Sequence, residues 1–238
     1  MRIAIIGASG GIGRAMCEKL ETEQRVTRIY ALSRSGKVPA TSKIIALSLD
    51  LRDEQTIAAA AKEIGSDGAL DGVIVASGLL SDAASGLSPE KSLREQSLPA
   101  FEDVFAINTF GPAIVAKYFL PLLARKQRVV FAALSARVGS ISDNRLGGWH
   151  AYRASKAALN MLVKNYALEM KRRNEDSIIV SLHPGTVATE LSAPFAGGSG
   201  RTVFSPAQSA DYLWQVMTNL SAADTGKAFD WQGKEIPA

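Results

Sequence analysis

Short apolar runs alternate along the whole chain with longer segments in which apolar residues recur at helical spacing. The runs of strand length lie at residues 2–7, 27–33, 43–49, 72–77, 128–134, 177–182 and 227–230, and the helical segments at 12–23, 54–64, 100–125, 151–173 and 206–220. Runs such as Ile44-Ile45-Ala46-Leu47 contain no polar residue, which is typical of strands buried on both faces of a parallel sheet. The alternation predicts one α/β domain over residues 1–238, with a doubly wound parallel sheet of about seven strands and helices on both faces.

Two segments break this alternation. The stretch near residues 78–98 is polar and is longer than most connections in a compact domain. The stretch near residues 190–205 contains Gly197-Gly198-Ser199-Gly200. Both follow predicted strands, and loops at the carboxyl ends of strands border the ligand crevice of such a sheet. We expect these two segments to form the substrate site, with exposed surface loops as the alternative.

Composition and charge fit a globular protein. Of the 238 residues, 47% are hydrophobic and 21% are charged, and the net charge of +4 is scattered along the chain. The densest basic run, Lys171-Arg172-Arg173, lies at a predicted helix end, where cations stabilise the helix dipole; a solvated helix end is favoured over a nucleic-acid patch. The first apolar run is too short for a signal peptide or a membrane span. We expect a cytoplasmic protein that binds neither nucleic acid nor membrane.

Cysteine and histidine are too scarce for a metal centre. Cys17 is the single cysteine, and His150 and His183 are the two histidines. An internal disulfide is therefore impossible, and we expect no metal site.

A glycine-rich turn directly follows the first predicted strand and opens the first predicted helix. It reads Gly7-Ala8-Ser9-Gly10-Gly11-Ile12-Gly13. Phosphate groups need backbone N–H donors at close range, which glycines leave accessible, and a helix N-terminus adds free amides and a positive dipole end. This turn predicts a dinucleotide site, with a tight turn that binds nothing as the alternative.

The end of the second predicted strand indicates which dinucleotide binds. An acidic residue at this place would hold a free ribose diol, whereas a cation would accept a ribose phosphate. The sequence has Ser33-Arg34-Ser35 there and no acid nearby. A guanidinium binds phosphate through two parallel hydrogen bonds, and the hydroxyl of Ser33 adds a donor. Unless Arg34 is simply an exposed loop residue, these residues favour NADP(H) over NAD(H).

A tyrosine and a lysine four residues apart open a strongly helical segment, as Tyr152-Arg153-Ala154-Ser155-Lys156. Residues at this spacing share one helix face. A free phenol has a pKa of about 10, and a neighbouring ammonium group favours the phenolate, which brings proton exchange within reach. We expect Tyr152 to act as the acid and base of a reaction and Lys156 to lower its pKa.

With these residues together, the chain resembles the short-chain dehydrogenase/reductase family over nearly its whole length. The resemblance implies a Rossmann-type domain and an NADP(H)-dependent oxidoreductase, with Tyr152 and Lys156 as catalytic residues and Asn108 supporting the lysine through a water. It implies cofactor contacts at Gly7, Ser9, Gly10, Gly11, Ile12, Gly13, Ser33, Arg34, Asp50, Leu51, Ala76, Ser77, Gly78, Tyr152, Lys156, Pro184, Gly185, Val187 and Thr189. Relatives often pair through the helices that bear Asn108 and Tyr152, so a homodimer or homotetramer is expected.

The chain departs from the family at the position of the catalytic serine. That serine stands three residues before a glycine, and in Ser135-Ala136-Arg137-Val138-Gly139 this position is Ala136. A hydroxyl there donates a hydrogen bond to the substrate oxygen. Ser135 is one candidate to take its place, although neighbouring residues on a strand face opposite ways. Ser140, beyond the glycine, is the other candidate.

Finer features resemble the C-factor and sniffer branch of carbonyl-reductase-like members, among them Gly147-Gly148-Trp149 and the ending Phe229-Asp230-Trp231-Gln232-Gly233. The resemblance implies a carbonyl reductase or alcohol dehydrogenase that acts on a small or medium carbonyl or hydroxyl compound. The alternative is a cofactor-binding signalling or scaffold protein with weak or vestigial catalysis. Ala136 favours this alternative, and the presence of Tyr152, Lys156 and Asn108 opposes it.

Overall fold

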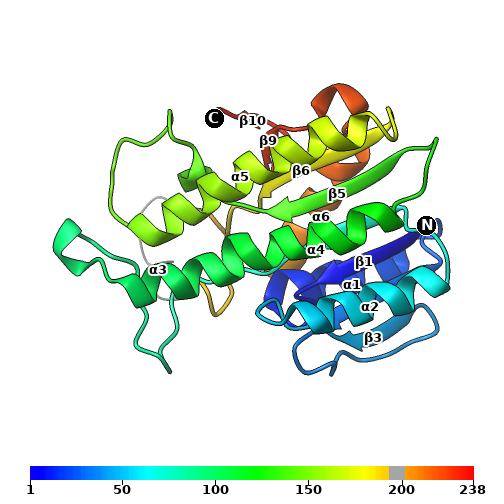
Figure 1. The fold of residues 1–238 in the computed structure, drawn as a ribbon, viewed down its shortest axis with the longest axis horizontal. Helices are drawn as coiled ribbons and strands as arrows, with labels where there is room; N and C mark the ends of the chain where they lie inside the picture. The colour runs from blue at the N-terminus through cyan, green and yellow to red at the C-terminus, as the bar shows by residue number, and fades with distance from the viewer. Residues whose placement is uncertain (193–201) are drawn as a thin grey trace.

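The computed structural model describes residues 1–192 and 202–238 and contains one eight-stranded sheet in the order β10-β9-β6-β5-β4-β1-β2-β3 (Figure 1). All neighbouring strands are parallel except β10, which pairs antiparallel with β9. The strand bounds are Arg2–Ile6 (β1), Arg28–Ser33 (β2), Ile44–Ser48 (β3), Gly72–Val75 (β4), Val129–Leu134 (β5), Ser177–His183 (β6), Ala228–Asp230 (β9) and Glu235–Ile236 (β10). The predicted doubly wound parallel sheet is confirmed, and β10 is a short addition at its edge.

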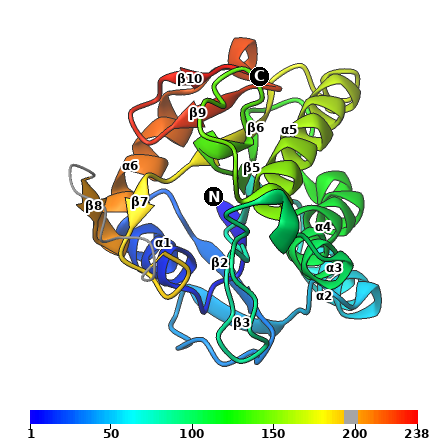
Figure 2. The same ribbon diagram turned by 90° about the vertical axis from the view of Figure 1, so that its left-hand side faces the viewer.

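Helices cover both faces of this sheet (Figure 2). On one face, α1 (Gly11–Thr22) packs beside α6 (Pro206–Asn219). On the other lie α2 (Glu54–Ser66), α4 (Gly111–Phe119) and α5 (His150–Lys171). Successive residues of β1 enter opposite cores: Ile3 and Ile5 join the α1–α6 side, and Ala4 and Ile6 join the α2–α4–α5 side. This two-sided burial explains why the strands are continuous apolar runs.

The segment predicted as one helix over residues 100–125 is a continuous helical rod of changing geometry. It consists of α3 (Leu98–Phe105), a π-helical turn η2 (Ala106–Phe110), α4 and a 3₁₀ turn η3 (Leu120–Leu122). It begins earlier than predicted because the Ser97 hydroxyl accepts a hydrogen bond from Ala100 N. Single π-turns inside helices often mark functional positions, and this one contains Asn108.

This rod, Leu98–Leu122, has the length and apolar composition of a membrane-crossing helix. However, 50% of its most apolar window is buried inside the protein. The core helix of a soluble domain has the same character.

Several short elements lie outside the predicted set. β7 (Thr186–Val187) and β8 (Val203–Phe204) form a separate parallel pair after β6. The segment near residues 78–98 contains an isolated bridge between Asp82 and Leu87 and the 3₁₀ turn η1 (Leu93–Glu95). Two further 3₁₀ turns are η4 (Arg137–Gly139) and η6 (Ala222–Asp224). Part of the second predicted loop, residues 193–201, lies outside the described residues.

Candidate active site

The glycine-rich turn lies where the sheet order reverses between β1 and β4. The amides of Gly7 and Ala8 both donate to Leu32 O, at 2.9 Å each, which ties the turn to the end of β2. A methyl group at Gly13 would lie 2.2 Å from Gly7 O, so this residue has to be glycine for α1 to start this close to the turn. Crevices at such reversal points are where parallel sheets bind ligands.

The first turn of α1 presents unpaired amides to the surface. Its cap residue, Gly10, provides no side-chain hydrogen bond, and no acidic residue occupies the first turn. Ser9, Gly10 and Gly11 are exposed. Free N–H groups at a positive dipole end, without a competing carboxylate, fit the phosphates of a dinucleotide.

The side chains after β2 and β3 lie beside this turn on the same sheet edge. Arg34 is exposed and forms no ion pair with another described residue. The hydroxyl of Ser33 is buried and has no hydrogen-bond partner in the described structure. Asp50 accepts a hydrogen bond from Arg52 N at 2.9 Å, which keeps its carboxylate at the end of β3, next to Leu51. Arg34 is therefore a cation free to take an anion.

The other predicted cofactor residues converge on the turn from two sides. A methyl group on Gly7 would meet the Ser77 hydroxyl at 2.6 Å, and one on Gly11 would meet Thr189 Cγ2 at 2.7 Å. The stretch containing Ala76, Ser77 and Gly78 therefore lies on one side of the glycine turn. The stretch from Pro184 through Gly185 and Val187 to Thr189 lies on the other.

A pocket of about 470 Å³ leads from the glycine turn to Tyr152. Ile12 and the stretch from Pro184 to Thr189 line its cofactor end. Of the two loops predicted to form the substrate site, Leu80, Leu191 and Ser192 line the pocket within the described residues. Most of the remaining wall is formed by residues between 135 and 153. Ser135 and Ala136 lie at the catalytic serine position named by the sequence analysis, which did not assign the others to the site: Arg137, Val138, Asp143, Arg145, Leu146, Trp149 and Arg153.

Tyr152 lines this pocket, and Lys156 is buried behind it, outside the lining. Their exposed fractions are 8% and 2%, and Lys156 Nζ lies 5.8 Å from the centre of the Tyr152 ring. Lys156 Nζ donates to Leu134 O at 2.8 Å, which anchors it to the end of β5. A methyl group on Gly139 would meet Lys156 Cβ at 2.8 Å, so the chain beyond β5 packs directly on the helix that carries both side chains.

Burial shifts the pKa of both groups toward their neutral forms. It raises the pKa of Tyr152 to about 12 and lowers the pKa of Lys156 to about 7. In the chain by itself, desolvation therefore sets the direction of the Tyr152 pKa, and the lowering of this pKa by a charged Lys156 beside a bound nicotinamide stays a prediction. At neutral pH, Tyr152 is a protonated phenol.

Asn108 joins three elements around this pair. Its amide pairs with the backbone of Leu79, accepting from Leu79 N and donating to Leu79 O at 2.8 Å each. It also donates to the Ser155 hydroxyl at 3.1 Å, and Ser155 in turn donates to Tyr152 O. Asn108 thereby links the chain after β4 and the π-turn to the first turn of α5. A water-mediated contact between Asn108 and Lys156 stays a prediction.

Comparison with known proteins decides the family. The family model described as short chain dehydrogenase matches residues 1–198. The chain belongs to the short-chain dehydrogenase family. The C-signal of Myxococcus xanthus is 38% identical over 133 residues, which are 56% of this chain and 75% of C-signal.

Solved structures agree with this assignment at the level of the fold. The carbonyl reductase Sniffer of D. melanogaster superposes with a TM-score of 0.85 at 23% identity, covering 100% of this chain and 99% of Sniffer. The NADPH-bound carbonyl reductase from chicken fatty liver gives a TM-score of 0.83 at 24% identity, covering 100% and 98%. The sequence resemblance is confirmed, and this short-chain dehydrogenase is an oxidoreductase.

Two neighbouring residues at the catalytic serine position of this dehydrogenase line the pocket, Ser135 and Ala136. Both can line it because β5 ends at Leu134, and side chains beyond the strand no longer alternate between its two faces. The Ser135 hydroxyl is buried without a hydrogen-bond partner in the described structure. Ser140 is also buried, but its hydroxyl accepts from Asp143 N at 3.1 Å, and it does not line the pocket.

His183 lies next to Ser135 across the sheet, since Leu134 and Leu182 are partners in the β5–β6 register and Ser135 N donates to Leu182 O. Its Nδ1 is buried and unpartnered among the described residues. Burial, and then the charge of Arg137, lower the pKa of His183 to about 4, against a smaller opposing effect of Asp230. His183 is therefore a neutral imidazole on the pocket wall, a position that sequence reasoning missed because no local pattern marks it.

Glu90 is a second residue that the sequence analysis did not single out. Its carboxylate is 4% exposed and accepts from Ala151 N at 3.3 Å through both oxygens. Its backbone oxygen accepts from Trp149 N. A carboxylate at the start of a helix stabilises the positive dipole end, so Glu90 holds the first turn of α5, and with it Tyr152, to the segment near residues 78–98.

Proposed function

We propose that this short-chain dehydrogenase is an NADP(H)-dependent carbonyl reductase that also runs as an alcohol dehydrogenase, with Tyr152 as its acid and base. The observation that carries the proposal is the buried Tyr152–Lys156 pair, whose tyrosine lines a pocket that begins at the glycine turn. One cavity thereby joins a phosphate-binding turn to a proton donor. The domain would act as one unit over residues 1–238.

The residues around the glycine turn fit a dinucleotide. In the proposal, the α1 amides hold the phosphates, Asp50 and Leu51 flank the adenine, and Pro184 through Thr189 orient the nicotinamide. Arg34 takes the ribose phosphate of NADP(H), because its guanidinium is exposed and unpaired among the described ion pairs. The NADPH bound in the chicken liver reductase supports this choice.

The bound cofactor supplies the hydride that the carbonyl carbon accepts. Tyr152 donates the proton to the carbonyl oxygen, and a pKa of about 12 keeps it protonated for this task at neutral pH. Lys156, with a pKa of about 7, gains and loses a proton near neutral pH, so it resupplies Tyr152 and stabilises the phenolate when charged. Ser135 donates to the substrate oxygen, and Asn108 keeps α5 in place.

The pocket wall favours a small or medium carbonyl compound. Leu80, Leu146 and Trp149 offer apolar contact, whereas Arg145 and Arg153 add positive charge. The ion pairs found among the described residues include neither of these two arginines. Carbonyl compounds that combine an apolar body with an acceptor or anionic group fit this wall best.

The similarity to C-signal supports the second candidate, a cofactor-binding signalling protein with weak catalysis. In this alternative, Ala136 has removed the hydroxyl that the reaction needs. The two candidates differ in one measurable property. A reductase consumes NADPH when a carbonyl substrate is added, whereas a signalling protein binds NADPH without consuming it.

The test follows NADPH absorbance with a panel of dicarbonyls and quinones, for wild type and for Tyr152→Phe. We expect Tyr152→Phe to lower kcat by about 10²–10⁴-fold while the Kd for NADPH stays within a factor of two or so. Tyr166→Phe is the matched control, since Tyr166 lies on the same helix but does not line the pocket. Full activity of Tyr152→Phe would exclude this residue as the proton donor.

We also propose that the protein forms a homodimer or homotetramer through the two long helical segments. Four large hydrophobic side chains on them are exposed: Leu98, Phe110, Met161 and Leu168. Exposed apolar side chains on neighbouring helices favour association with a second copy. A cytoplasmic location stays a prediction.

A further inference from the structure

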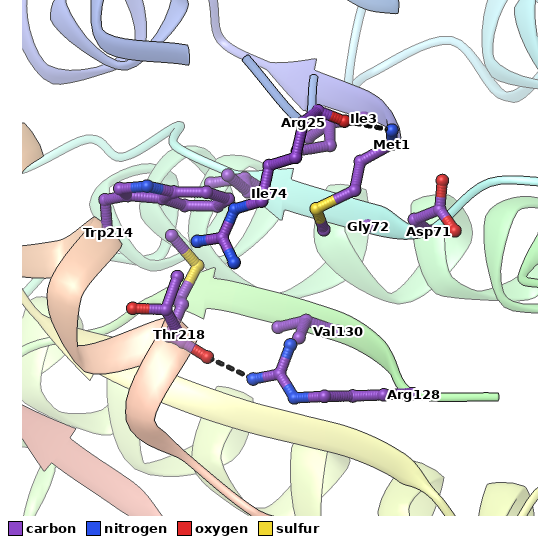
Figure 3. Close-up of a pocket in the computed structure, with 11 residues that line it drawn as sticks. Met1, Ile3, Arg25, Asp71, Gly72, Ile74, Arg128, Val130, Trp214 and Thr218 are labelled. Atoms are coloured by element: carbon purple, nitrogen blue, oxygen red, sulfur yellow. Dashed lines mark hydrogen bonds between the residues drawn. The ribbon is translucent and has the colours of Figure 1, made fainter. Parts of the chain in front are cut away.

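A second cavity, of about 250 Å³, lies at the amino ends of three central strands, whereas the active site lies at their carboxyl ends; Figure 3 shows the residues that line it. Side chains of all three strands line it: Ile3 of β1, Ile74 of β4 and Val130 of β5. The carboxyl ends of the same strands lead to the glycine turn and to Ser135. None of the residues that line this cavity lines the pocket at Tyr152.

The floor of this cavity is apolar. Besides the three strand residues, the buried Met217 and the Trp214 indole of α6 form it. A pocket that takes a drug-sized ligand usually measures about 300–1,000 Å³, so this cavity suits a smaller molecule. Its floor selects an apolar body such as a short alkyl chain or a single ring.

Two arginines border the apolar floor. In Figure 3 the Arg25 guanidinium lies beside Trp214 and the Arg128 guanidinium lies beside Val130, and both arginines line the cavity. The Arg25 guanidinium lies 4.9 Å from the centre of the Trp214 ring. Arg128 Nη2 donates to Leu220 O at 3.2 Å and to Met217 O at the end of α6. Burial, and then the charge of Arg25, lower the pKa of Arg128.

The Asp and Glu residues in the described part of the chain do little to neutralise Arg25 and Arg128. The nearest carboxylate to Arg25 belongs to Glu23, with its oxygen 4.0 Å from Nε, and the described ion pairs include none with Arg128. Asp71 also lines the cavity, but its two oxygens accept from Arg2 N and from Gln127. An anion between the two guanidinium groups would relieve their repulsion.

We propose that this cavity binds a small amphipathic anion, whose carboxylate lies between Arg25 and Arg128 and whose apolar body covers Ile74, Val130 and Trp214. The two arginines supply charge-assisted hydrogen bonds. The floor supplies the hydrophobic contribution to binding. This ligand site is separate from the active-site pocket, because the two share no lining residue.

The experiment is a calorimetric titration of the protein, saturated with NADPH, with octanoate and in parallel with 1-octanol. We expect octanoate to bind in the cavity that contains Arg25 and Arg128, with 1-octanol at least ten-fold weaker there. NMR spectra should show the largest octanoate-induced shifts at the amides of Gly72 and Thr218, which line the cavity. Equal binding of the alcohol would overturn the anionic part of the proposal. Absence of octanoate binding at millimolar concentration would overturn all of it.

Substitutions in the two pockets show where octanoate binds. Arg25→Gln and Arg128→Gln should each weaken octanoate binding ten-fold or more, whereas Arg128→Lys keeps the charge and should retain most of it. If Arg128→Gln fails to fold, Arg25→Gln and Arg128→Lys still show whether octanoate binds in this cavity. Arg145→Gln, in the active-site pocket, is the control and should bind octanoate like wild type. Loss of binding in Arg145→Gln with normal binding in Arg25→Gln would move the ligand to the active site.

Discussion

Removal of the Ser135 hydroxyl tests the arrangement of the active site most directly. In Ser135→Ala, a buried hydroxyl without a partner among the described residues is lost, next to a pocket wall that also contains Ala136. If Ser135 only fills space, Ser135→Ala lowers neither turnover nor the stability of the fold. If Ser135 holds the substrate oxygen, turnover falls while the fold is unharmed.

The structure separates these two effects in magnitude. A buried polar group without a hydrogen bond costs about 1–3 kcal/mol of desolvation, so Ser135→Ala should leave the Tm unchanged or raise it. A hydroxyl that donates to the oxygen of the transition state is worth about 2.7–4 kcal/mol, which is about 10²–10³ in kcat. Loss of activity together with retained or increased Tm is therefore the expected result, and a folding defect does not produce this combination.

The assay combines steady-state NADPH consumption with thermal unfolding, on Ser135→Ala, on Ala136→Ser and on the double variant. Ala136→Ser restores a hydroxyl at the family position, and ten-fold higher kcat/KM corresponds to about 1.4 kcal/mol of transition-state stabilisation. If Ser135 does the work, Ala136→Ser alone gains little but rescues Ser135→Ala in the double variant. Full activity of Ser135→Ala would refute the reasoning, and a strong gain in Ala136→Ser would then identify position 136 as the one that limits catalysis.

Three further changes test separate parts of the proposal. Arg34→Ala should weaken NADPH binding by about 1.5–3 kcal/mol and leave NADH binding nearly unchanged, as measured by calorimetry. Lys37→Ala, at a nearby exposed lysine, is the control. Equal losses for both cofactors would contradict the ribose-phosphate assignment. Glu90→Gln removes the negative charge at the start of α5. We expect it to lower the free energy of unfolding by about 1 kcal/mol, or the Tm by roughly 2–4 °C, and to lower kcat. An unchanged Tm and kcat would show that this carboxylate does not hold Tyr152 in place. His183 has a pKa of about 4 in the folded chain and 6.5 as the ordinary value, so between these pH values the unfolded state binds a proton that the native state does not, and stability falls as the pH drops. In wild type, this effect should lower the free energy of unfolding by about 3 kcal/mol between pH 6.5 and 4, and His183→Gln should lack this decrease when both are measured by urea unfolding. An unchanged pH dependence in His183→Gln would assign the acid sensitivity to another residue.

The layers of the fold and the residues of the glycine turn were predictable from local patterns. The seven parallel strands appear where the apolar runs lie, because burial on both faces favours apolar residues at most of their positions. Tyr152 and Lys156 were recognisable because residues four apart on a helix share a face in any tertiary context. Gly13 was recognisable because a tight strand-to-helix turn leaves no room for a side chain.

The other features of the site depend on contacts between residues far apart in the sequence, and only the tertiary structure decided them. Glu90 reaches Ala151 across 61 residues, a contact that no spacing rule predicts. Ser135 and Ala136 line the same pocket because β5 ends at Leu134, directly before Ser135, and the exact end of a strand is set by packing. The direction of the Tyr152 pKa shift was also beyond the sequence, since it depends on how much water the surrounding chain removes. Sequence determined which chemical groups this protein carries and their local order, whereas burial and long-range contacts determined their protonation, their partners and the space around them.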